Sequence, residues 1–339
     1  MRRYVLGLDG GGSKTHALVV NEMGHVLGFG QAGTSNHQVY GLQPAMMEVQ
    51  RGVKSALEGA GLSPSEIELG CFCLAGADLP EDYIMLQEAV HALNLARSVV
   101  IKNDTLAALR SGTTRSWGVV VICGTGFNAA GRSPGGEEIV FPGLGPISGD
   151  WGGGGTLSRE MIRAVMRAWD GRGKPTLLTA LVLKALGIDS VEKLLALLYH
   201  KQIDPQHLLD LVPLLFEAGE SGDQVAQDLI VRMGTEVAVA ANALIRRLSL
   251  KEEDVEVVLG GSVFKGRGDL MLNTITRLVH EEAPKARIMR PHHEPVVGAV
   301  LLALEAAGAV IDGALYQSLE GNWQSVNRCK AVNLPEEHP

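Results

Sequence analysis

The stretch Tyr4-Val5-Leu6-Gly7-Leu8-Asp9-Gly10-Gly11-Gly12-Ser13-Lys14-Thr15 begins with an apolar strand and ends in an acidic residue and three glycines. Residues 16–21 (HALVVN) read as a second strand, so this glycine turn joins strand to strand. Glycine lets the main chain approach a ligand with its N–H groups pointing inward, which makes a concavity for anions. Ser13 and Thr15 add hydroxyl groups, and Lys14 adds one positive charge. The stretch therefore predicts a phosphate-binding turn made by Gly10, Gly11, Gly12, Ser13, Lys14 and Thr15.

The same pattern of strand, glycine turn and strand recurs later in the chain. Residues 117–123 form an apolar run, followed by the turn Gly124-Thr125-Gly126 and a returning strand over 127–131. Asp9 and Gly124 stand 115 residues apart, which indicates an internal duplication. A third apolar run, over 255–259, ends in Gly260-Gly261-Ser262.

The remaining sequence predicts an α/β protein in two parts. Strands over 68–75 and 98–102 alternate with helices over 44–60 and 81–93, and the chain is mostly helical from Thr156. With 339 residues, the chain is long enough for about two domains. We expect an N-terminal lobe over residues 1–113, a C-terminal lobe over 114–305, and a C-terminal helix and tail over 306–339. The polar residues 320–339 are expected to form an edge segment or a loose tail.

Composition excludes several classes of protein. The formal net charge is −8 and no block of Lys or Arg interrupts it, which argues against nucleic-acid binding. No apolar stretch reaches the ~20 residues of a membrane span, so no membrane partner is expected. The cysteines, at positions 71, 73, 123 and 329, form no C-x-x-C pair, which argues against a zinc site or a disulfide framework. Cys71 and Cys73 share one strand face and are predicted to be small core residues. We expect a cytoplasmic protein.

Familiar nucleotide motifs fit the first turn poorly. The turn leads into a strand, whereas G-x-G-x-x-G opens a helix, and it lacks the spacing of a P-loop. A dinucleotide-dependent dehydrogenase is therefore disfavoured. What remains is a hairpin clamp for phosphate in which Asp9 holds hydrated Mg²⁺, a cation that needs few carboxylates and many waters.

Several short motifs together resemble the N-acetylglucosamine kinase family, within the BadF/BadG/BcrA/BcrD ATPases and the actin-like and sugar kinase superfamily. Residues 7–15 resemble its first phosphate motif and Gly124-Thr125-Gly126-Phe127-Asn128 its second. Thr34-Ser35-Asn36-His37 resembles the sugar-binding loop, and Asn103-Asp104 stands where the catalytic Asp stands. Gly149-Asp150-Trp151-Gly152 resembles the Gly-Asp-x-Gly loop, Gly260-Gly261-Ser262 the adenosine motif, and residues 295–299 the start of the closing helix. The matches run in order from residue 4 to about 305.

This resemblance implies two actin-like (ribonuclease H-like) lobes with a nucleotide cleft between them. It implies ATP and Mg²⁺ as cofactors, an amino sugar as the small-molecule substrate, and a homodimer. Asp104 would be the catalytic base, and Gly260, Gly261 and Ser262 would bind adenosine. The substrate-binding residues would be Asn36, Asn103, Asp104, Thr125, Gly126, Asn128 and Asp150. The family often has Glu after this last Asp, where Trp151 and the run Gly152–Gly155 stand here.

Simpler roles compete with these. Asp104 follows an apolar strand and precedes a helical segment, so it could be only a helix N-cap. Asp150 could be only a turn residue. The adjacent His292 and His293 suggest a metal, but no further spacing completes a site, and a solvated loop is the better interpretation.

Two functions from different classes follow. One is a sugar kinase that makes the 6-phosphate of an amino sugar. The alternative is an ATPase switch such as the activator of 2-hydroxyacyl-CoA dehydratases, which shares an iron–sulfur cluster between two subunits. Cys123 lacks a suitable second cysteine for that role, and a filament-forming actin relative has no positive feature here. Glucosamine, N-acetylglucosamine and a muramic acid relative all remain possible substrates.

Overall fold

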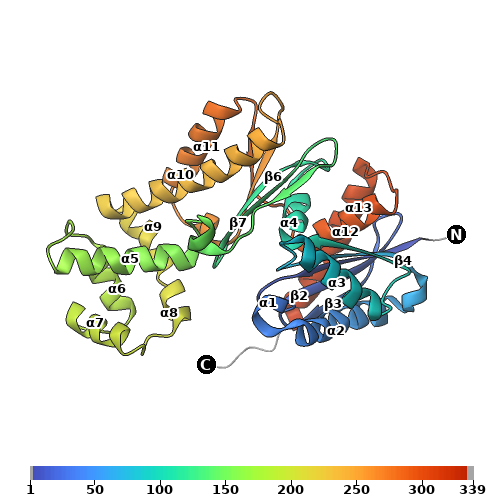
Figure 1. The fold of residues 1–339 in the computed structure, drawn as a ribbon, viewed down its shortest axis with the longest axis horizontal. Coiled ribbons are helices and arrows are strands. Elements are labelled where there is room, and N and C mark those ends of the chain that lie inside the picture. The colour runs from blue at the N-terminus through green and yellow to red at the C-terminus, as the bar shows by residue number, and fades with distance from the viewer. Residues whose placement is uncertain (1–2, 334–339) are drawn as a thin grey trace. The chain divides into compact units, whose positions relative to one another are not determined.

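A computed structural model describes residues 3–333 of the protein and divides the chain into two compact units. Unit 1 contains the chain up to Trp117 and from Pro291 onward, and unit 2 runs from Gly118 to Arg290. Both units combine one five-stranded sheet with helices (Figure 1). The predicted α/β class is therefore confirmed. Within residues 3–333, no helix is long and apolar enough to cross a membrane.

The sheet of unit 1 has the order β3-β2-β1-β4-β5. Its strands are β1 (Tyr4–Gly10), β2 (Thr15–Asn21), β3 (Val26–Ala32), β4 (Ile67–Leu74) and β5 (Ser98–Asn103). The first three strands form an antiparallel meander, whereas β1, β4 and β5 run parallel. Asp9 pairs with Cys73, and Cys73 pairs with Lys102. The carboxyl ends of the three parallel strands therefore meet at one edge of the sheet.

Helices cover this sheet. They are α1 (His37–Tyr40), α2 (Leu42–Ala60), α3 (Pro80–Ala92), α4 (Asp104–Gly112), α12 (Pro295–Ala306) and α13 (Gly313–Asn333). Helix α2 packs on β2 and β3, while α12 packs on α4, β1 and β4. The core between sheet and α2 contains wholly buried side chains such as Leu6, Val19, Val49 and Phe72.

Unit 2 repeats the strand order of unit 1. Its strands are β6 (Gly118–Cys123), β7 (Phe127–Arg132), β8 (Glu138–Val140), β9 (Glu256–Gly260) and β10 (Arg287–Met289), arranged β10-β9-β6-β7-β8. As in unit 1, the first three form an antiparallel meander, and β6, β9 and β10 run parallel. The internal duplication predicted from the two glycine turns is confirmed.

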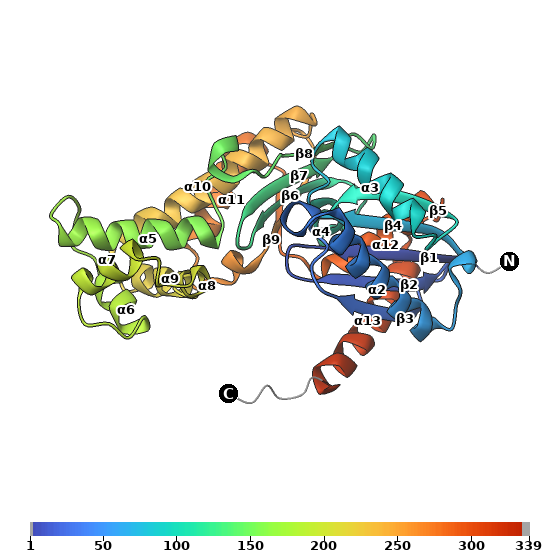
Figure 2. The same ribbon diagram turned by 60° about the horizontal axis from the view of Figure 1, so that its bottom comes forward.

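Between β8 and β9, unit 2 carries a large helical insertion. It comprises α5 (Gly154–Trp169), α6 (Leu178–Ala185), α7 (Val191–Tyr199), α8 (Pro205–Leu209), α9 (Val212–Glu220) and α10 (Gln224–Arg247). Helices α5 to α9 lie beside one another in both views (Figures 1 and 2). Helix α10 packs on β6, β7 and α11 (Leu270–Glu282).

The C-terminal part of the chain differs from the expected layout. Residues 291–305, expected in the second lobe, belong to unit 1, and the first boundary lies at 117/118 rather than 113/114. Two glycines allow α12 its close approach: a Cβ at Gly7 would lie 2.3 Å from Val300 N, and one at Gly298 would lie 1.9 Å from Ala107 O.

Residues 320–333 continue α13 and are not the expected edge segment or loose tail. Leu315, Leu319 and Trp323 bury one side of this helix, and the Trp323 ring lies 5.8 Å from that of Phe29 on β3. Burial of these apolar side chains explains the helix, since the polar residues around them gave no strand or helix signal. The expected tail over 334–339 lies outside the described residues.

Candidate active site

The first glycine turn is open at its tip and packed at its base. Gly11 N donates to Lys14 O at 3.0 Å, which closes the hairpin between β1 and β2. A Cβ at Gly12 would meet nothing within 4 Å, and Gly12, Ser13 and Lys14 are exposed. At Gly10, in contrast, a Cβ would lie 2.3 Å from the Ser35 hydroxyl oxygen. The tip of this turn is therefore the part that a ligand can reach.

Thr15 differs from its neighbours in the turn because its side chain is wholly buried. Its hydroxyl donates to Gly33 O at 2.8 Å and lies 2.9 Å from the Ser35 hydroxyl. The hydroxyl proton of Thr15 is thus used within unit 1, although the sequence predicted this residue as a phosphate ligand. The Thr15 side chain joins the glycine turn to the predicted sugar loop.

Asp9 lies near the end of β1 and Asp104 directly after β5, at the carboxyl edge of the parallel strands. Both carboxyl groups are partly buried. Burial, followed by the charge of Asp104, raises the pKa of Asp9 to about 8. Burial, followed by the charge of Asp78, raises the pKa of Asp104 to about 6. Two nearby carboxyl groups with separated pKa values are typical of a catalytic or metal-binding site, because like charges in low dielectric resist joint ionisation.

Asn103 has a structural role that the sequence did not predict. Its side chain is wholly buried, and its Oδ1 accepts from Thr105 N at 2.9 Å, which makes it the N-cap of α4. Its Nδ2 donates to Ala77 O at 3.1 Å and to Asp78 Oδ1 at 2.8 Å. All the hydrogen-bonding groups of this side-chain amide have partners within unit 1, which leaves the amide none for the substrate contact that the resemblance implies.

The same geometry decides between the two roles considered for Asp104. Asp104 is the first residue of α4, whereas the cap is Asn103. The N-cap interpretation of Asp104 is therefore wrong, and its carboxylate is available for chemistry at the positive end of the helix.

The predicted sugar loop lies between β3 and α1. Asn36 caps α1, with its Oδ1 accepting from Gln38 N at 2.9 Å. This leaves the Nδ2 donors of Asn36 as the groups suited to a sugar hydroxyl. Thr34 Oγ1 donates to Gly11 O at 3.0 Å, which gives the loop a second link to the phosphate turn.

In unit 2, the run Gly152–Gly155 packs against the second glycine turn. Gly154 N donates to Gly124 O at 2.7 Å, and Gly155 N donates to Thr125 O at 2.9 Å. A Cβ at Gly153, whose φ is +78°, would lie 2.3 Å from Gly126 O. From the other side, a Cβ at Gly261 would lie 2.3 Å from Cys123 O. Positions 153 and 261 therefore require glycine, because only glycine permits such a close backbone approach.

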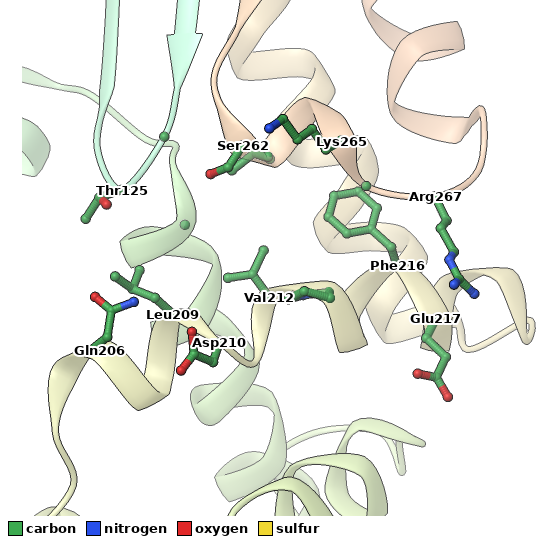
Figure 3. A pocket seen from close by; sticks show the side chains of 15 residues that line it. Thr125, Gln206, Leu209, Asp210, Val212, Phe216, Glu217, Ser262, Lys265 and Arg267 are labelled. Atoms are coloured by element: carbon green, nitrogen blue, oxygen red, sulfur yellow. The ribbon is translucent and has the colours of Figure 1, made fainter. Parts of the chain in front are cut away.

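A cavity of about 570 Å³ lies wholly within unit 2 and joins two of the predicted motifs (Figure 3). Gly124 and Thr125 line it from the second turn, and Ser262 lines it from the short 3₁₀ helix Ser262–Lys265. The volume is typical of a small-molecule site. Gly260, Gly261 and Gly126 are not among the lining residues; Gly260 is buried.

Most of the cavity wall was missed by the sequence analysis. It comes from α8 and the residue after it, from α9, and from the 3₁₀ helix with the loop that follows: Gln206, Leu209, Asp210, Val212, Pro213, Phe216, Glu217, Val263, Lys265, Gly266 and Arg267. Figure 3 shows Gln206, Leu209 and Asp210 across the cavity from Ser262. A Cβ at Gly266 would lie 2.6 Å from the Phe216 ring, so that glycine fits the ring closely. No motif marks these helices, and only the fold brings them to the turns.

The last predicted sugar residues of unit 2 are Asn128 and Asp150. Asn128 lies on β7, and its Oδ1 accepts from Ala129 N at 2.7 Å. Asp150 Oδ2 accepts from Gly145 N at 3.0 Å and from Ser148 Oγ at 2.6 Å, so this carboxylate closes its own loop. Trp151 carries the Arg232 guanidinium 4.1 Å from its ring centroid. Its large stacked side chain marks this site as different from a family pattern with Glu.

The exposure of the side chains bears on the predictions of a solvated loop at His292 and His293 and of core cysteines at positions 71 and 73. His292 is exposed, as a solvated loop requires, but the His293 side chain is only 4 % exposed, with Nε2 3.8 Å from Glu320 Oε1. Burial lowers the pKa of His293. Among the described residues there is no group of three or more metal-ligating side chains. Cys71 and Cys73 are buried core residues, with their sulfurs 3.8 Å apart.

A duplicated meander-and-parallel sheet with a glycine turn in each copy defines the actin-like ATPase class of protein. A solved structure titled a putative N-acetylglucosamine kinase from Chromobacterium violaceum shares this fold, with a TM-score of 0.63 and 23% identity over 89% of this chain and 99% of that one. The profile of the BadF/BadG/BcrA/BcrD ATPase family matches residues 6–303, and the chain belongs to that family.

Relatives with assigned activities are similar along most of their length. The N-acetyl-D-glucosamine kinase of Dictyostelium discoideum is 30% identical over 317 residues, covering 90% of this chain and 99% of its own. The N-acetylmuramic acid/N-acetylglucosamine kinase of Clostridium acetobutylicum is 27% identical over 301 residues, covering 89% of this chain and 98% of its own.

Proposed function

We propose that the protein is an ATP-dependent sugar kinase that phosphorylates an amino sugar, N-acetylglucosamine or glucosamine, at the 6-hydroxyl. The family membership and the names of the two relatives support this activity. The observation that carries the proposal is the pair Asp9 and Asp104 at one edge of the unit 1 sheet, with raised and separated pKa values.

In this proposal Asp104 is the general base. With a pKa of about 6, its carboxylate is mostly ionised at pH 7 and more basic than an ordinary Asp. The proton of the sugar 6-hydroxyl passes to Asp104 as the oxygen bonds to the γ-phosphorus, and the bond to the β-phosphate oxygen breaks to release ADP. Such a transfer depends mainly on positioning and on neutralising charge.

Asp9 is proposed to hold Mg²⁺ through water. The residues fit this ion, because burial and then the negative charge of Asp104 raise the pKa of the Asp9 carboxyl to about 8, and a divalent cation would offset that negative charge. When bound, Mg²⁺ supplies charge neutralisation at the phosphates. Asp9 then keeps its ionised form near pH 7.

The remaining predicted contacts complete the proposal. The open tip of the first turn, with the second turn (Gly124, Thr125, Gly126), would bind phosphate through main-chain N–H groups. The unit 2 cavity beside Ser262 would take the nucleoside, with Gly260 and Gly261 forming the turn that carries Ser262 to the cavity. Asn36, Thr125, Gly126, Asn128 and Asp150 would contact the sugar. The homodimer stays a prediction that sedimentation analysis tests.

A coupled ADP-release assay over amino sugars and plain hexoses with MgATP tests the function. We expect ADP release that depends on an amino sugar and yields its 6-phosphate. Sugar-independent ATP hydrolysis, with no sugar phosphorylated, would instead favour an ATPase switch. For that alternative, Cys123 is poorly placed, since its thiol is buried and burial raises its pKa.

A further inference from the structure

Asp78 occupies a junction that the sequence analysis did not single out. It lies in the loop between β4 and α3, partly buried. Its Oδ1 accepts a hydrogen bond from Asn103 Nδ2 at 2.8 Å, and its Oδ2 accepts one from Gln38 Nε2 at 3.0 Å. Two side-chain amides from distant parts of the sequence therefore converge on one carboxylate.

Only a carboxylate satisfies both amides at once. An ionised Asp offers acceptors on both oxygens, whereas the Asn amide offers one oxygen and one NH₂ group. With Asn at position 78, one of the two incoming NH₂ groups would face another NH₂ group, and one hydrogen bond would be lost. The residue type is therefore set by the two donors it accepts from.

Each donor belongs to a different part of the proposed site. Gln38 stands two residues after Asn36 in α1, the helix that follows the sugar loop, and Asn36 Oδ1 accepts a hydrogen bond from Gln38 N. Asn103 directly precedes Asp104 and caps its helix, wholly buried. Asp78 thus connects the proposed sugar contact to the residue that fixes the start of α4, from which the Asp104 carboxylate projects.

We propose that Asp78 is a positioning residue of the reaction, which holds Asn103 and so aligns the Asp104 carboxylate, and which ties that alignment to the sugar loop through Gln38. This inference rests on the proposed sugar kinase function. The charge of Asp78 also acts on Asp104, as the largest influence on its raised pKa after burial. Asp82 and His37 are the other charged or titratable neighbours that act on Asp78.

Asp78→Asn, alone and combined with Gln38→Glu, tests the role. For the single variant we expect kcat to fall about 10- to 100-fold, the effect of misplacing a reacting group by about an ångström. The KM for sugar should change little, because Asp78 is proposed to align the base rather than to bind sugar. In the double variant the amide and the carboxylate exchange places: the side chain at position 38 accepts from the amide at position 78, whose oxygen accepts from Asn103. We expect this exchange to restore most of kcat.

Melting curves of the parent and both variants serve as the test of folding. If the parent is active and the folded Asp78→Asn variant keeps a kcat within twofold of it, the positioning role of Asp78 is overturned while the proposed function stands. A loss of kcat that the folded double variant fails to restore would overturn that role as well. A parent that phosphorylates no sugar would instead overturn the proposed function.

Discussion

The hydroxyl of Thr34 donates a hydrogen bond to the main-chain oxygen of Gly11, 3.0 Å away. Thr15 adds the reverse link, from the phosphate turn to Gly33 and Ser35 of the sugar loop. Two loops that are joined by these hydrogen bonds cannot rearrange independently. A ligand that orders one loop is therefore expected to favour binding at the other, and the coupling is reciprocal.

Thr34→Val should weaken this coupling while keeping the size of the side chain. We expect the factor by which sugar tightens binding of a non-hydrolysable ATP analogue to fall about fivefold, the worth of one net hydrogen bond. Calorimetric titrations with and without sugar measure it, and Thr34→Ser, which keeps the hydroxyl, is the matched control. An unchanged factor in the folded Val variant would show that the loops are not coupled through this bond.

Gly11→Val should weaken nucleotide binding much more than it affects folding. A Cβ at Gly11 would meet only Lys14 O, at an ordinary 3.6 Å, so the added side chain projects toward the open tip. We expect ATP affinity to fall at least ~10-fold, a loss of about 1.4 kcal/mol, with little change in melting temperature. Gly10→Val is the contrasting variant, because its Cβ would lie 2.3 Å from the Ser35 hydroxyl and should destabilise unit 1. Equal ATP affinity for the folded Gly11→Val protein and the parent would argue against the clamp.

Asp9→Asn should stabilise the metal-free protein at alkaline pH. The pKa of Asp9 is raised from 3.8 to about 8, so the native state binds a proton that the unfolded chain has released. Stability therefore falls as pH rises from about 4 to about 8, and the amide removes that loss. We expect a gain of about 1–3 kcal/mol at pH 8.5 that disappears below pH 4, a range reduced for the partial exposure of Asp9. Denaturant unfolding in a chelator measures it, and a variant less stable than its parent at pH 8.5 would contradict the assignment.

Ser262→Trp should block the cavity of unit 2. Ser262 is exposed and lines the cavity, so an indole there takes up ligand space without entering the core. We expect ATP affinity to fall ~10-fold or more, about 1.4 kcal/mol, with the melting temperature nearly unchanged. Fluorescence of the new indole gives an independent readout of ligand entry. ATP binding as tight as in the parent would place the nucleoside elsewhere.

The duplicated sheets could be predicted because each leaves a local signal, an apolar strand that ends in glycines and returns as a strand. The return of α12 to unit 1 could not be predicted in this way. It depends on contacts between residues far apart in the sequence, Gly7 with Val300 and Gly298 with Ala107. Likewise, the wall of the cavity comes from α8 and α9, whose residues form no motif until the fold gathers them.

Within the site, the sequence could not predict the separate roles of the neighbours Asn103 and Asp104. Both residue types cap helices well, so the sequence alone does not say which of them is the cap. The structure assigns the cap to Asn103, buries it and uses its whole amide, which depends on the distant Ala77 and Asp78. The base role proposed for Asp104 rests on that long-range arrangement.

The Asp104→Asn variant separates a general base from a carboxylate with a purely structural role. Because Asn103 makes the cap, the change should leave α4 and the melting temperature nearly intact while it removes the charge and the basicity of Asp104. Sugar-dependent ADP release, measured beside ATP binding and a melting curve, is expected to fall by ~10²–10⁴, the usual contribution of general acid–base catalysis, with ATP affinity nearly unchanged. A folded Asn variant that turns over sugar within a few-fold of the parent would show that Asp104 is not the base.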